Sequence, residues 1–343
     1  MITKDDTILI TGGSGFIGTN LIEFFETKKY GKIINFDKAP PTKKQQSDYW
    51  FKGNIMNTEN LSDVFEKYNP NIIIHLAART DTLSDVLEDY IENYKGSENV
   101  ISEIMRHNYV KHVIITSTQY VYKSKTIPLP AKDNTYAPHT TYGISKMMDE
   151  EMTRNSGMMC PWTIIRPCNV WGPWHMRYPE ELWKIIGKGY YIHPTKNPVI
   201  RTYAYVKNLV YQLDQILNAD LDIVNHSTFY LGDVPIDSYM LFNEISNQLN
   251  NKSARIFPKL IFYLGAKTGD VLRKVGVKFP LYTVRYKNMI EDFYAPSNIT
   301  VNLFGVRNSN LADNVKETID WLYGEGNDFF VYWKKRKISK ISF

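Results

Sequence analysis

Tyr142 and Lys146 are the residues whose types and spacing most directly suggest acid–base chemistry. Four positions apart on a helix, a phenol and an ammonium lie on one face, one turn apart. A nearby ammonium favours the phenolate, so we expect the pKa of Tyr142 to fall from about 10 toward neutrality. Such a group could exchange the proton in an alcohol–ketone interconversion. The same spacing also arises by chance on solvated helix faces, so the preceding elements decide its meaning.

A glycine-rich turn precedes this pair near the start of the chain. Residues 7–11 form a short apolar run typical of a buried strand, and helical periodicity begins near Asn20. The turn between them carries Gly12, Gly15 and Gly18. Strand, glycine turn and helix are the context of a dinucleotide pyrophosphate site, in which the helix N-terminus faces the phosphates. The sequence therefore predicts a dinucleotide site here, although glycines alone are also compatible with an ordinary turn.

The acidic residue Asp37 supports the dinucleotide interpretation and bears on cofactor choice. It ends the next apolar run, 32–36, and lies 19 residues after Gly18. A carboxylate at this point accepts hydrogen bonds from the adenosine ribose and repels a 2′-phosphate. Lys38 follows directly and could soften that repulsion. We expect NAD rather than NADP.

Three further apolar runs, with amphipathic segments between them, predict the fold. The runs are 71–78, 112–116 and 162–165, and the amphipathic segments are 59–68, 84–108 and 142–154. Strands alternating with helices predict an α/β protein with a Rossmann-type, doubly wound parallel sheet and ligands at the carboxyl ends of its strands. We expect an NAD-binding domain over 1–170, with a return segment near 201–220. Residues 171–343 then form mainly a smaller α/β substrate lobe.

At this point the chain resembles the extended short-chain dehydrogenase/reductases, and within them the NAD-dependent nucleotide-sugar epimerase/dehydratase family of polysaccharide biosynthesis. The resemblance covers roughly the first half of the chain. It rests on motifs in the family's order at residues 11–18, 37, 75–78, 93–96, 118–122, 142–146 and 166–173, with a weaker match over 201–206.

The resemblance implies a role for each matched residue. Thr118 would bind the reacting sugar oxygen, Tyr142 would be the acid/base, and Lys146 would anchor the ribose and hold Tyr142 ionised. Asn54 departs from the family's usual Asp, and its amide oxygen could accept the same bond from adenine. The implied cofactor residues are Gly12, Gly15, Phe16, Ile17, Gly18, Asp37, Asn54, Ile55, Leu76, Ala77, Ala78, Asn93, Thr116, Ser117, Tyr142, Lys146 and Pro167.

The resemblance also implies a diphosphate-binding substrate site. Asn169 and Arg201 would contact the diphosphate, for which a guanidinium is well suited, although a surface ion pair also explains Arg201. Arg285 is a second candidate arginine, equal to Arg273. The full implied set is Thr80, Thr118, Asn169, Arg201 and Arg285. The aromatic stretch 171–198, with Trp174, His175, Arg177 and Tyr178, is compatible equally with a substrate lining and with core.

Gln119 and Tyr120 bear on the type of reaction. The family's 4,6-dehydratases carry an acid pair directly after the catalytic Thr, and neither residue here is a carboxylic acid. The sequence therefore favours a 4-epimerase that works through a transient 4-keto sugar. A nucleotide-sugar 4-ketoreductase remains an alternative. So does a hydroxysteroid-type dehydrogenase, which residues 256–293 resemble, and so does a non-catalytic cofactor-binding regulator.

Composition narrows the remaining possibilities. The chain has 343 residues, 43% of them hydrophobic, and a formal charge of +5, which suits an anionic nucleotide sugar without requiring nucleic acid. Cys160 and Cys168 are most simply free thiols in a reducing cytosol, so we expect a cytoplasmic protein. The spacing of His175 and His193 suggests no metal site. The family implies a homodimer. The tail 329–337 pairs aromatic with basic residues, and a solvated tail is favoured over one resting on an anionic membrane.

Overall fold

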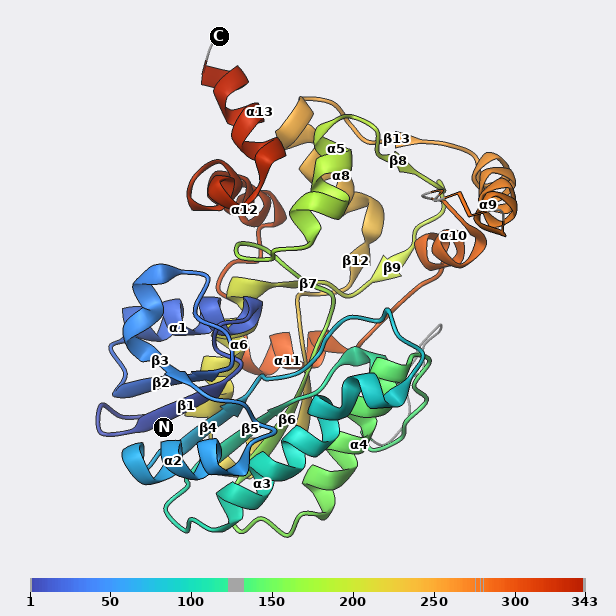
Figure 1. The fold of residues 1–343 in the computed structure, drawn as a ribbon. Coiled ribbons are helices and arrows are strands. Elements are labelled where there is room, and N and C mark those ends of the chain that lie inside the picture. The colour runs from blue at the N-terminus through green and yellow to red at the C-terminus, as the bar shows by residue number, and fades with distance from the viewer. Residues whose placement is uncertain (1, 123–132, 275, 278, 280, 342–343) are drawn as a thin grey trace.

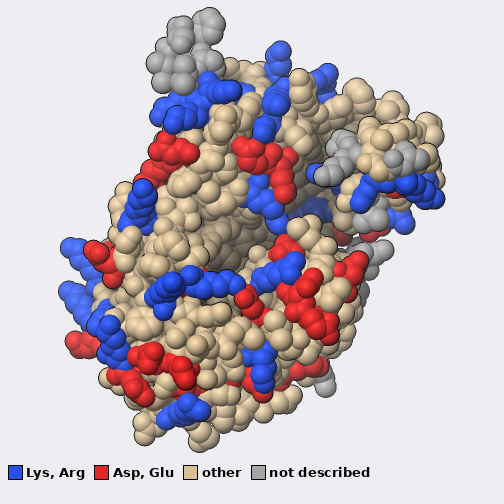
Figure 2. All heavy atoms as spheres, viewed as in Figure 1, with Lys and Arg blue, Asp and Glu red and all other residues tan. Residues whose placement is uncertain are grey.

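The computed structural model describes residues 2–122, 133–274, 276–277, 279 and 281–341, so three positions of the stretch 256–293 lie outside the described residues. The chain folds into a sheet-containing lobe and a smaller second lobe above it, with a two-helix arm projecting from the second lobe (Figure 1). A hollow lies between the two lobes (Figure 2).

A seven-stranded sheet with every neighbouring pair parallel forms the first lobe, which confirms the predicted Rossmann-type fold. In spatial order it runs β11-β6-β5-β4-β1-β2-β3. The strand order reverses between β1 and β4, the switch point at which such sheets bind ligands. The strands are β1 (Thr7–Thr11), β2 (Lys32–Asp37), β3 (Trp50–Lys52), β4 (Ile72–His75), β5 (His112–Thr116), β6 (Trp162–Pro167) and β11 (Ser227–Leu231).

Side-chain alternation along β1 divides the core into two layers. Ile8 and Ile10 pack with α1 (Phe16–Lys28) and α6 (Val206–Asn218) on one face. Leu9 points to the other face. That second layer contains α2 (Thr58–Tyr68) and α3 (Ser97–Met105), and α4 (Thr141–Asn155) packs beside α3. Both faces of the sheet are therefore covered, as a parallel sheet requires.

The second lobe has its own aromatic-rich core, to which α8 (Ser238–Asn250), α12 (Leu311–Tyr323) and α13 (Val331–Ile341) contribute. Its short strand pairs are β7 (Val170–Trp171) with β10 (Ala204–Tyr205), β8 (Ile192–His193) with β13 (Arg255–Ile256), and β9 (Ile200–Arg201) with β12 (Ile236–Asp237). The remaining helices are α5 (Lys184–Gly187), α7 (Leu221–Val224), α9 (Lys259–Lys274), α10 (Thr283–Ile290) and α11 (Ser297–Phe304). Short 3-10 or π turns are η1 (Lys44–Tyr49), η2 (Leu87–Tyr90), η3 (Glu92–Gly96), η4 (Gln119–Val121), η5 (Pro179–Trp183) and η6 (Glu325–Phe329).

The C-terminal tail is fixed to the second lobe as far as Arg336. Trp333 is fully buried, and its indole donates to the Pro179 carbonyl at 3.2 Å. The Arg336 guanidinium donates to the Gly187 and Leu249 carbonyls. One aromatic and one basic side chain of the tail are therefore bound within the second lobe. Within the described residues we find no helix of the length and apolarity needed to traverse a bilayer.

Candidate active site

A cavity of about 380 Å³ lies at the carboxyl ends of β1, β2, β4, β5 and β6. It brings together most of the residues expected from the sequence, although they come from segments far apart in the chain. The predicted residues that line it are Gly12, Gly15, Phe16, Ile17, Gly18, Asp37, Asn54, Ile55, Leu76, Ala77, Ala78, Thr80, Thr116, Ser117, Thr118, Tyr142, Pro167 and Asn169. Asn93, Lys146, Arg201 and Arg285 do not line it.

The turn between β1 and α1 leaves no room for a side chain at Gly12 or at Gly18. Gly12 has φ +72°, and a Cβ there would lie 2.7 Å from the backbone of Ala77 at the end of β4. A Cβ on Gly18 would lie 2.5 Å from the Gly13 backbone. Helix α1 begins directly after Gly15, so its unpaired N–H groups face the cavity, where they suit a pyrophosphate. This cradle fits the phosphates of a dinucleotide.

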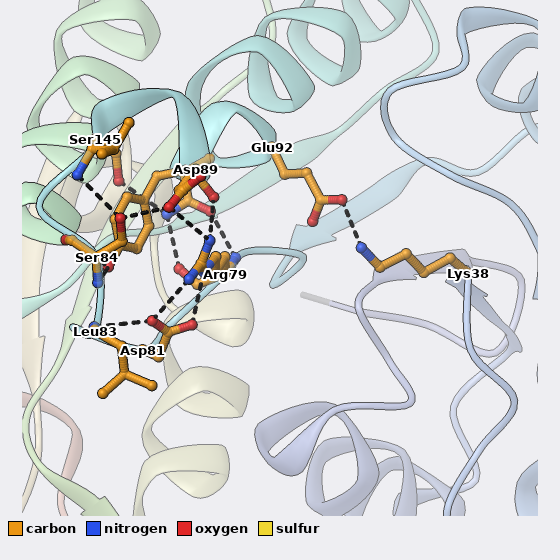
Figure 3. Close-up of polar contacts among 11 residues, drawn as sticks. Lys38, Arg79, Asp81, Leu83, Ser84, Asp89, Glu92 and Ser145 are labelled. Carbon is orange, nitrogen blue, oxygen red and sulfur yellow. Dashed lines mark hydrogen bonds and ion pairs between the residues drawn. The ribbon is translucent and has the colours of Figure 1, made fainter.

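Asp37 ends β2 at the rim of the same cavity. Its carboxylate accepts from the backbone N–H of Ser14 at 3.1 Å and of Ala39 at 2.9 Å, which fixes its orientation. Burial raises the pKa of Asp37, while these backbone hydrogen bonds and the charge of Lys38 lower it. The Lys38 ammonium pairs with Glu92 on η3 at 2.6 Å, as Figure 3 shows. Lys38 is therefore neutralised by a partner other than Asp37.

We expect the protein to bind NAD more tightly than NADP. Asp37→Ala should lower the ratio of the NAD affinity to the NADP affinity about tenfold or more. Hydrogen bonds to charged groups contribute about 1.5–3 kcal/mol each, and the mutation also removes repulsion of the 2′-phosphate. Glu92→Gln releases Lys38 from its ion pair. It should raise the affinity for NADP relative to NAD by about fivefold or less, because exposed ion pairs contribute about 0–1 kcal/mol. Fluorescence titration measures these affinities.

Glu98→Gln is the matched control for Glu92→Gln, since Glu98 pairs with Lys95 on the protein surface and does not line the cavity. It should leave both affinities unchanged. Tighter binding of NADP than NAD by the unmodified protein would mean that Lys38 outweighs Asp37.

The segment that follows β4 is held in place by a cluster of polar contacts (Figure 3). Arg79 donates to Asp81 at 2.8 Å and to the Asp89 carbonyl at 2.9 Å. Asn93 accepts from the Arg79 N–H at 2.7 Å and donates to Ser145 on α4 at 3.0 Å. The buried Asn93 thus connects this segment to α4 through hydrogen bonds. Thr80 of the same segment lines the cavity.

Thr118 and Tyr142 meet at the deep end of the cavity. Thr118 caps η4 directly after β5, and Tyr142 lies in the first turn of α4. Both side chains are buried, and a hydrogen bond joins them. One turn further along α4, Lys146 is buried and forms an ion pair with the buried Asp149. A hydroxyl and a phenol therefore lie together in the cavity, with a cation in the layer behind them.

The expected lowering of the pKa of Tyr142 is wrong for this structure. Burial raises that pKa above its usual value, Tyr120 and Asp149 raise it further, and the hydrogen bond from Thr118 opposes them. The main physical reason is that the phenol is buried, which disfavours the phenolate. In addition, Asp149 neutralises Lys146, so the ammonium does not act on the phenol as a free positive charge. The i, i+3 spacing of Lys146 and Asp149 was the sequence signal that could have revealed this pair.

The two positions after Thr118 present no acid to the cavity. Gln119 is buried, and Tyr120 lines the cavity with its ring stacked on His139 at 5.3 Å. Phe293 meets Tyr120 edge-on, also at 5.3 Å. Burial raises the pKa of Tyr120, so its phenol holds its proton at neutral pH. The wall beside the Thr118–Tyr142 pair is aromatic and uncharged.

The stretch after β7 contributes three side chains to the cavity: His175, Arg177 and Tyr178. His175 stacks on Tyr178 at 4.0 Å, and burial lowers the pKa of His175 to about 4, so the imidazole is neutral near pH 7. Arg177 is a cation to which sequence reasoning gave no specific role; its place next to the motif at 166–173 was the available signal. Trp174, by contrast, is buried in the core of the second lobe.

Two of the three predicted diphosphate ligands, Asn169 and Arg201, lie together, and Arg285 lies elsewhere. Asn169 lines the main cavity and also an adjoining one of about 140 Å³, which Arg201 lines with it. Arg201 donates to the Asn288 carbonyl and, at 3.1 Å, to the Glu291 carbonyl, so both of these contacts are to backbone oxygens. Arg285 is exposed on α10 and lines neither cavity, and its role at the diphosphate stays a prediction. Within the part of the chain that the structure describes, no three His, Cys, Asp or Glu residues could hold a metal ion together.

The switch-point cavity, its glycine cradle and the Thr118–Tyr142 pair define a dinucleotide-binding α/β protein. The chain belongs to the NAD dependent epimerase/dehydratase family, whose model matches residues 8–225. NAD is the cofactor of that family, and the cradle, Asp37 and the cavity fit it. The resemblance to the extended short-chain dehydrogenase/reductases is thereby confirmed.

Two curated relatives illustrate the range of activities in the family. The chain is 28% identical to the N-acetyl-alpha-D-glucosaminyl-diphospho-ditrans,octacis-undecaprenol 4-epimerase of Escherichia coli O157:H7, over 82% of this chain and 85% of that protein. It is 32% identical to the dTDP-D-glucose 4,6-dehydratase of Dictyostelium discoideum, over 63% of this chain and 57% of that protein.

Solved structures agree on the fold. The dTDP-glucose 4,6-dehydratase of Bacillus anthracis in complex with NAD has a TM-score of 0.70 at 20% identity, covering 96% of this chain and 99% of its own. The UDP-glucose 4-epimerase of Thermus thermophilus in complex with NAD has a TM-score of 0.68 at 16% identity, covering 93% of this chain and 99% of its own. Both lobes therefore have counterparts of the same shape.

Proposed function

We propose that this protein is an NAD-dependent epimerase that inverts C4 of a sugar carried on a diphosphate, through a transient 4-keto sugar. The observation that carries the proposal is the buried Thr118–Tyr142 pair in the cavity, beside Gln119 and Tyr120 rather than carboxylic acids. Besides the acid/base that serves hydride transfer at C4, dehydration needs further groups to remove the C5 proton and to protonate the leaving C6 hydroxyl, whereas epimerisation needs only the group at C4.

In this mechanism the chain's own groups bind the sugar and move one proton. Thr118 hydrogen-bonds the C4 oxygen, and Tyr142, as its phenolate, takes the proton of that hydroxyl and later returns it. Burial disfavours the phenolate in the cavity by itself, and the positive charge of an oxidised nicotinamide ring bound there would favour it. Bound NAD supplies the hydride acceptor at C4 and the hydride donor on return. The glycine cradle and Asp37 would hold its pyrophosphate and ribose, and the cavity residues at the ends of β4 and β5 would hold its nicotinamide half.

Arg177 and Arg201 are the proposed cations for the substrate diphosphate. Arg177 lines the main cavity and Arg201 the adjoining one, with Asn169 shared between them. Burial raises the pKa of Tyr120, and the positive charges of Arg201 and Arg177 both oppose that rise, which supports a common positive field at this end of the cavity. A guanidinium can bind a diphosphate with two parallel hydrogen bonds.

The group to which the diphosphate links the sugar, its carrier, is the second point of the proposal. Relatives act on UDP-, dTDP- and GDP-linked sugars, and one acts on a sugar linked to undecaprenyl diphosphate. The diphosphate is common to all of these substrates, so the arginines are expected to bind it whatever follows it. A nucleoside diphosphate is the carrier that we propose, with a homodimer as the working assembly.

We expect turnover at substoichiometric NAD, with no net change in NADH absorbance, when the enzyme is offered UDP-, dTDP- and GDP-sugars. In deuterated water the carbon atoms of the product should stay unlabelled, because the hydrogen leaves and returns as hydride. NMR of the product measures both inversion at C4 and deuterium content.

The other outcomes each point to a different reaction. Deuterium on carbon would indicate that the protein is a dehydratase and not an epimerase, despite Gln119 and Tyr120. Stoichiometric consumption of NADH with a 4-keto sugar would replace it with a 4-ketoreductase. Turnover of a sterol but of no sugar would favour the hydroxysteroid-type alternative.

A further inference from the structure

Helices α9 and α10 form an arm that projects from the second lobe (Figure 1). One face of α9 packs onto α10 through Phe262, Ala266 and Gly269, which follow each other at helical spacing and are buried. A Cβ on Gly269 would collide with the Leu281 carbonyl, so the two segments touch backbone to backbone. The inner face of α9 thus has its partner.

The outer face of α9 is also apolar, and it is exposed. Leu260, Ile261, Leu264 and Val271 are 66%, 54%, 56% and 63% exposed. At 100° per residue these four positions fall within about 100° of one another, nearly opposite the buried face. Single exposed apolar residues are ordinary, but four on one side of one helix, interrupted there by Thr268, indicate an interaction surface. We call these four residues the outer stripe.

The two helices of the arm are rich in basic residues. Helices α9 and α10 carry Lys259, Lys267, Arg273, Lys274, Arg285 and Lys287 against one acid, Asp270, which accepts from the backbone of Thr283 at 3.0 Å. Figure 2 shows Lys and Arg gathered along the projecting end of the molecule beside uncharged surface. Helical spacing puts Lys267 and Lys274 at one edge of the stripe. The occupant of this face must therefore accept apolar contact and positive charge together.

We propose that the α9–α10 arm lies on an anionic membrane surface, with the outer stripe entering the boundary between headgroups and acyl chains. An interfacial helix combines an apolar stripe with basic residues whose long side chains reach back to the headgroups. Each such residue adds attraction to an anionic leaflet. A protein partner is less suited, because the cores of protein interfaces are depleted in Lys.

The arm is continuous with the wall of the active-site cavity. From α10 the chain runs into Phe293, which meets Tyr120 edge-on in the wall. Arg201 donates to the carbonyls of Asn288 and Glu291 at the end of α10. A docked arm would therefore hold the cavity close to the bilayer. The proposal concerns a surface and does not depend on the proposed reaction.

The test is sedimentation of the full-length protein with vesicles. We expect binding to phosphatidylcholine vesicles that contain about one third phosphatidylglycerol, little binding to phosphatidylcholine alone, and release at high salt. The variants Leu264→Glu and Lys267→Glu/Lys274→Glu should each weaken binding at least tenfold. Leu303→Glu and Lys316→Glu are the matched controls, since Leu303 is 54% exposed on α11 and Lys316 is exposed on α12. Both should bind as the unmodified protein does.

Three results would overturn the proposal. These are no binding to the anionic vesicles, equal weakening by the control variants, and a self-association that Leu264→Glu abolishes without any vesicle binding. Circular dichroism checks that each variant is folded. Turnover of a sugar nucleotide in solution is measured in parallel, so lost vesicle binding with normal turnover would contradict only the membrane surface.

Discussion

Replacing Tyr142 with Phe should lower turnover by roughly 10²–10⁴-fold while leaving the fold and NAD binding intact. That is the range expected for the loss of a general acid/base, and the substitution removes one oxygen from a buried ring. Thr118 then loses its hydrogen bond to Tyr142 but still accepts from the backbone N–H of Tyr120 at 3.3 Å. Initial rates at saturating substrate, together with NAD titration, separate the loss of chemistry from a loss of cofactor.

Tyr109→Phe is the matched control. It removes a phenol oxygen that is buried and that has no hydrogen-bond partner among the residues that the structure describes, and Tyr109 lies beside the core cluster under α2 and α3. It should leave turnover within about twofold. If Tyr142→Phe retained near-normal turnover, Tyr142 would have no part in proton transfer, and the proposed mechanism would have to be abandoned.

Glu150→Ala should lower the free energy of unfolding by about 3–5 kcal/mol, the range for removing one partner of a buried ion pair. Glu150 and Arg166 are both fully buried and form a two-pronged contact at 2.8 and 2.7 Å. Arg166 also donates to Tyr230 on β11 at 2.9 Å, so the pair ties α4 to two strands. Alanine would leave the guanidinium buried without its counter-ion. Urea unfolding measures the change.

The neighbouring Glu151→Ala is the control, since Glu151 is exposed on the same helix and its loss should change stability by about 0.5 kcal/mol or less. A loss below about 1 kcal/mol for Glu150→Ala would mean that Arg166 finds another partner or water. Because α4 carries Tyr142 and Lys146, we also expect Glu150→Ala to reduce turnover of the protein that remains folded.

The strands and the cofactor turn were predictable because their signals are local. Apolar runs at 7–11 and 112–116 became β1 and β5 with the same bounds, and the helix expected over 142–154 became α4, Thr141–Asn155. A buried parallel strand must be apolar on both faces, and a tight turn against a neighbouring strand has room only for glycine. A few consecutive residues therefore suffice to recognise each of these two features. The segment 84–108 was less predictable: it divides into η2, η3 and α3, because short turns carry little periodicity.

Tertiary structure alone decided how charges pair and which side chains share the cavity. Lys146 was expected to act on Tyr142 and instead pairs with Asp149, while Arg201 binds backbone carbonyls at the end of α10. The pairing of a long cationic side chain depends on which carboxylates and carbonyls folding brings within reach, and those groups can be 90 positions away. Likewise the sequence of α9 is amphipathic, but only its packing on α10 showed that one apolar face stays uncovered.

The sequence thus determined the sheet, the cofactor turn and the identity of the chemical groups, because each of these depends on residues close together in the chain. The pKa of Tyr142, the positions of the arginines and the exposed stripe were decided by long-range packing, because electrostatic and solvation energies depend on distances that only the folded chain defines.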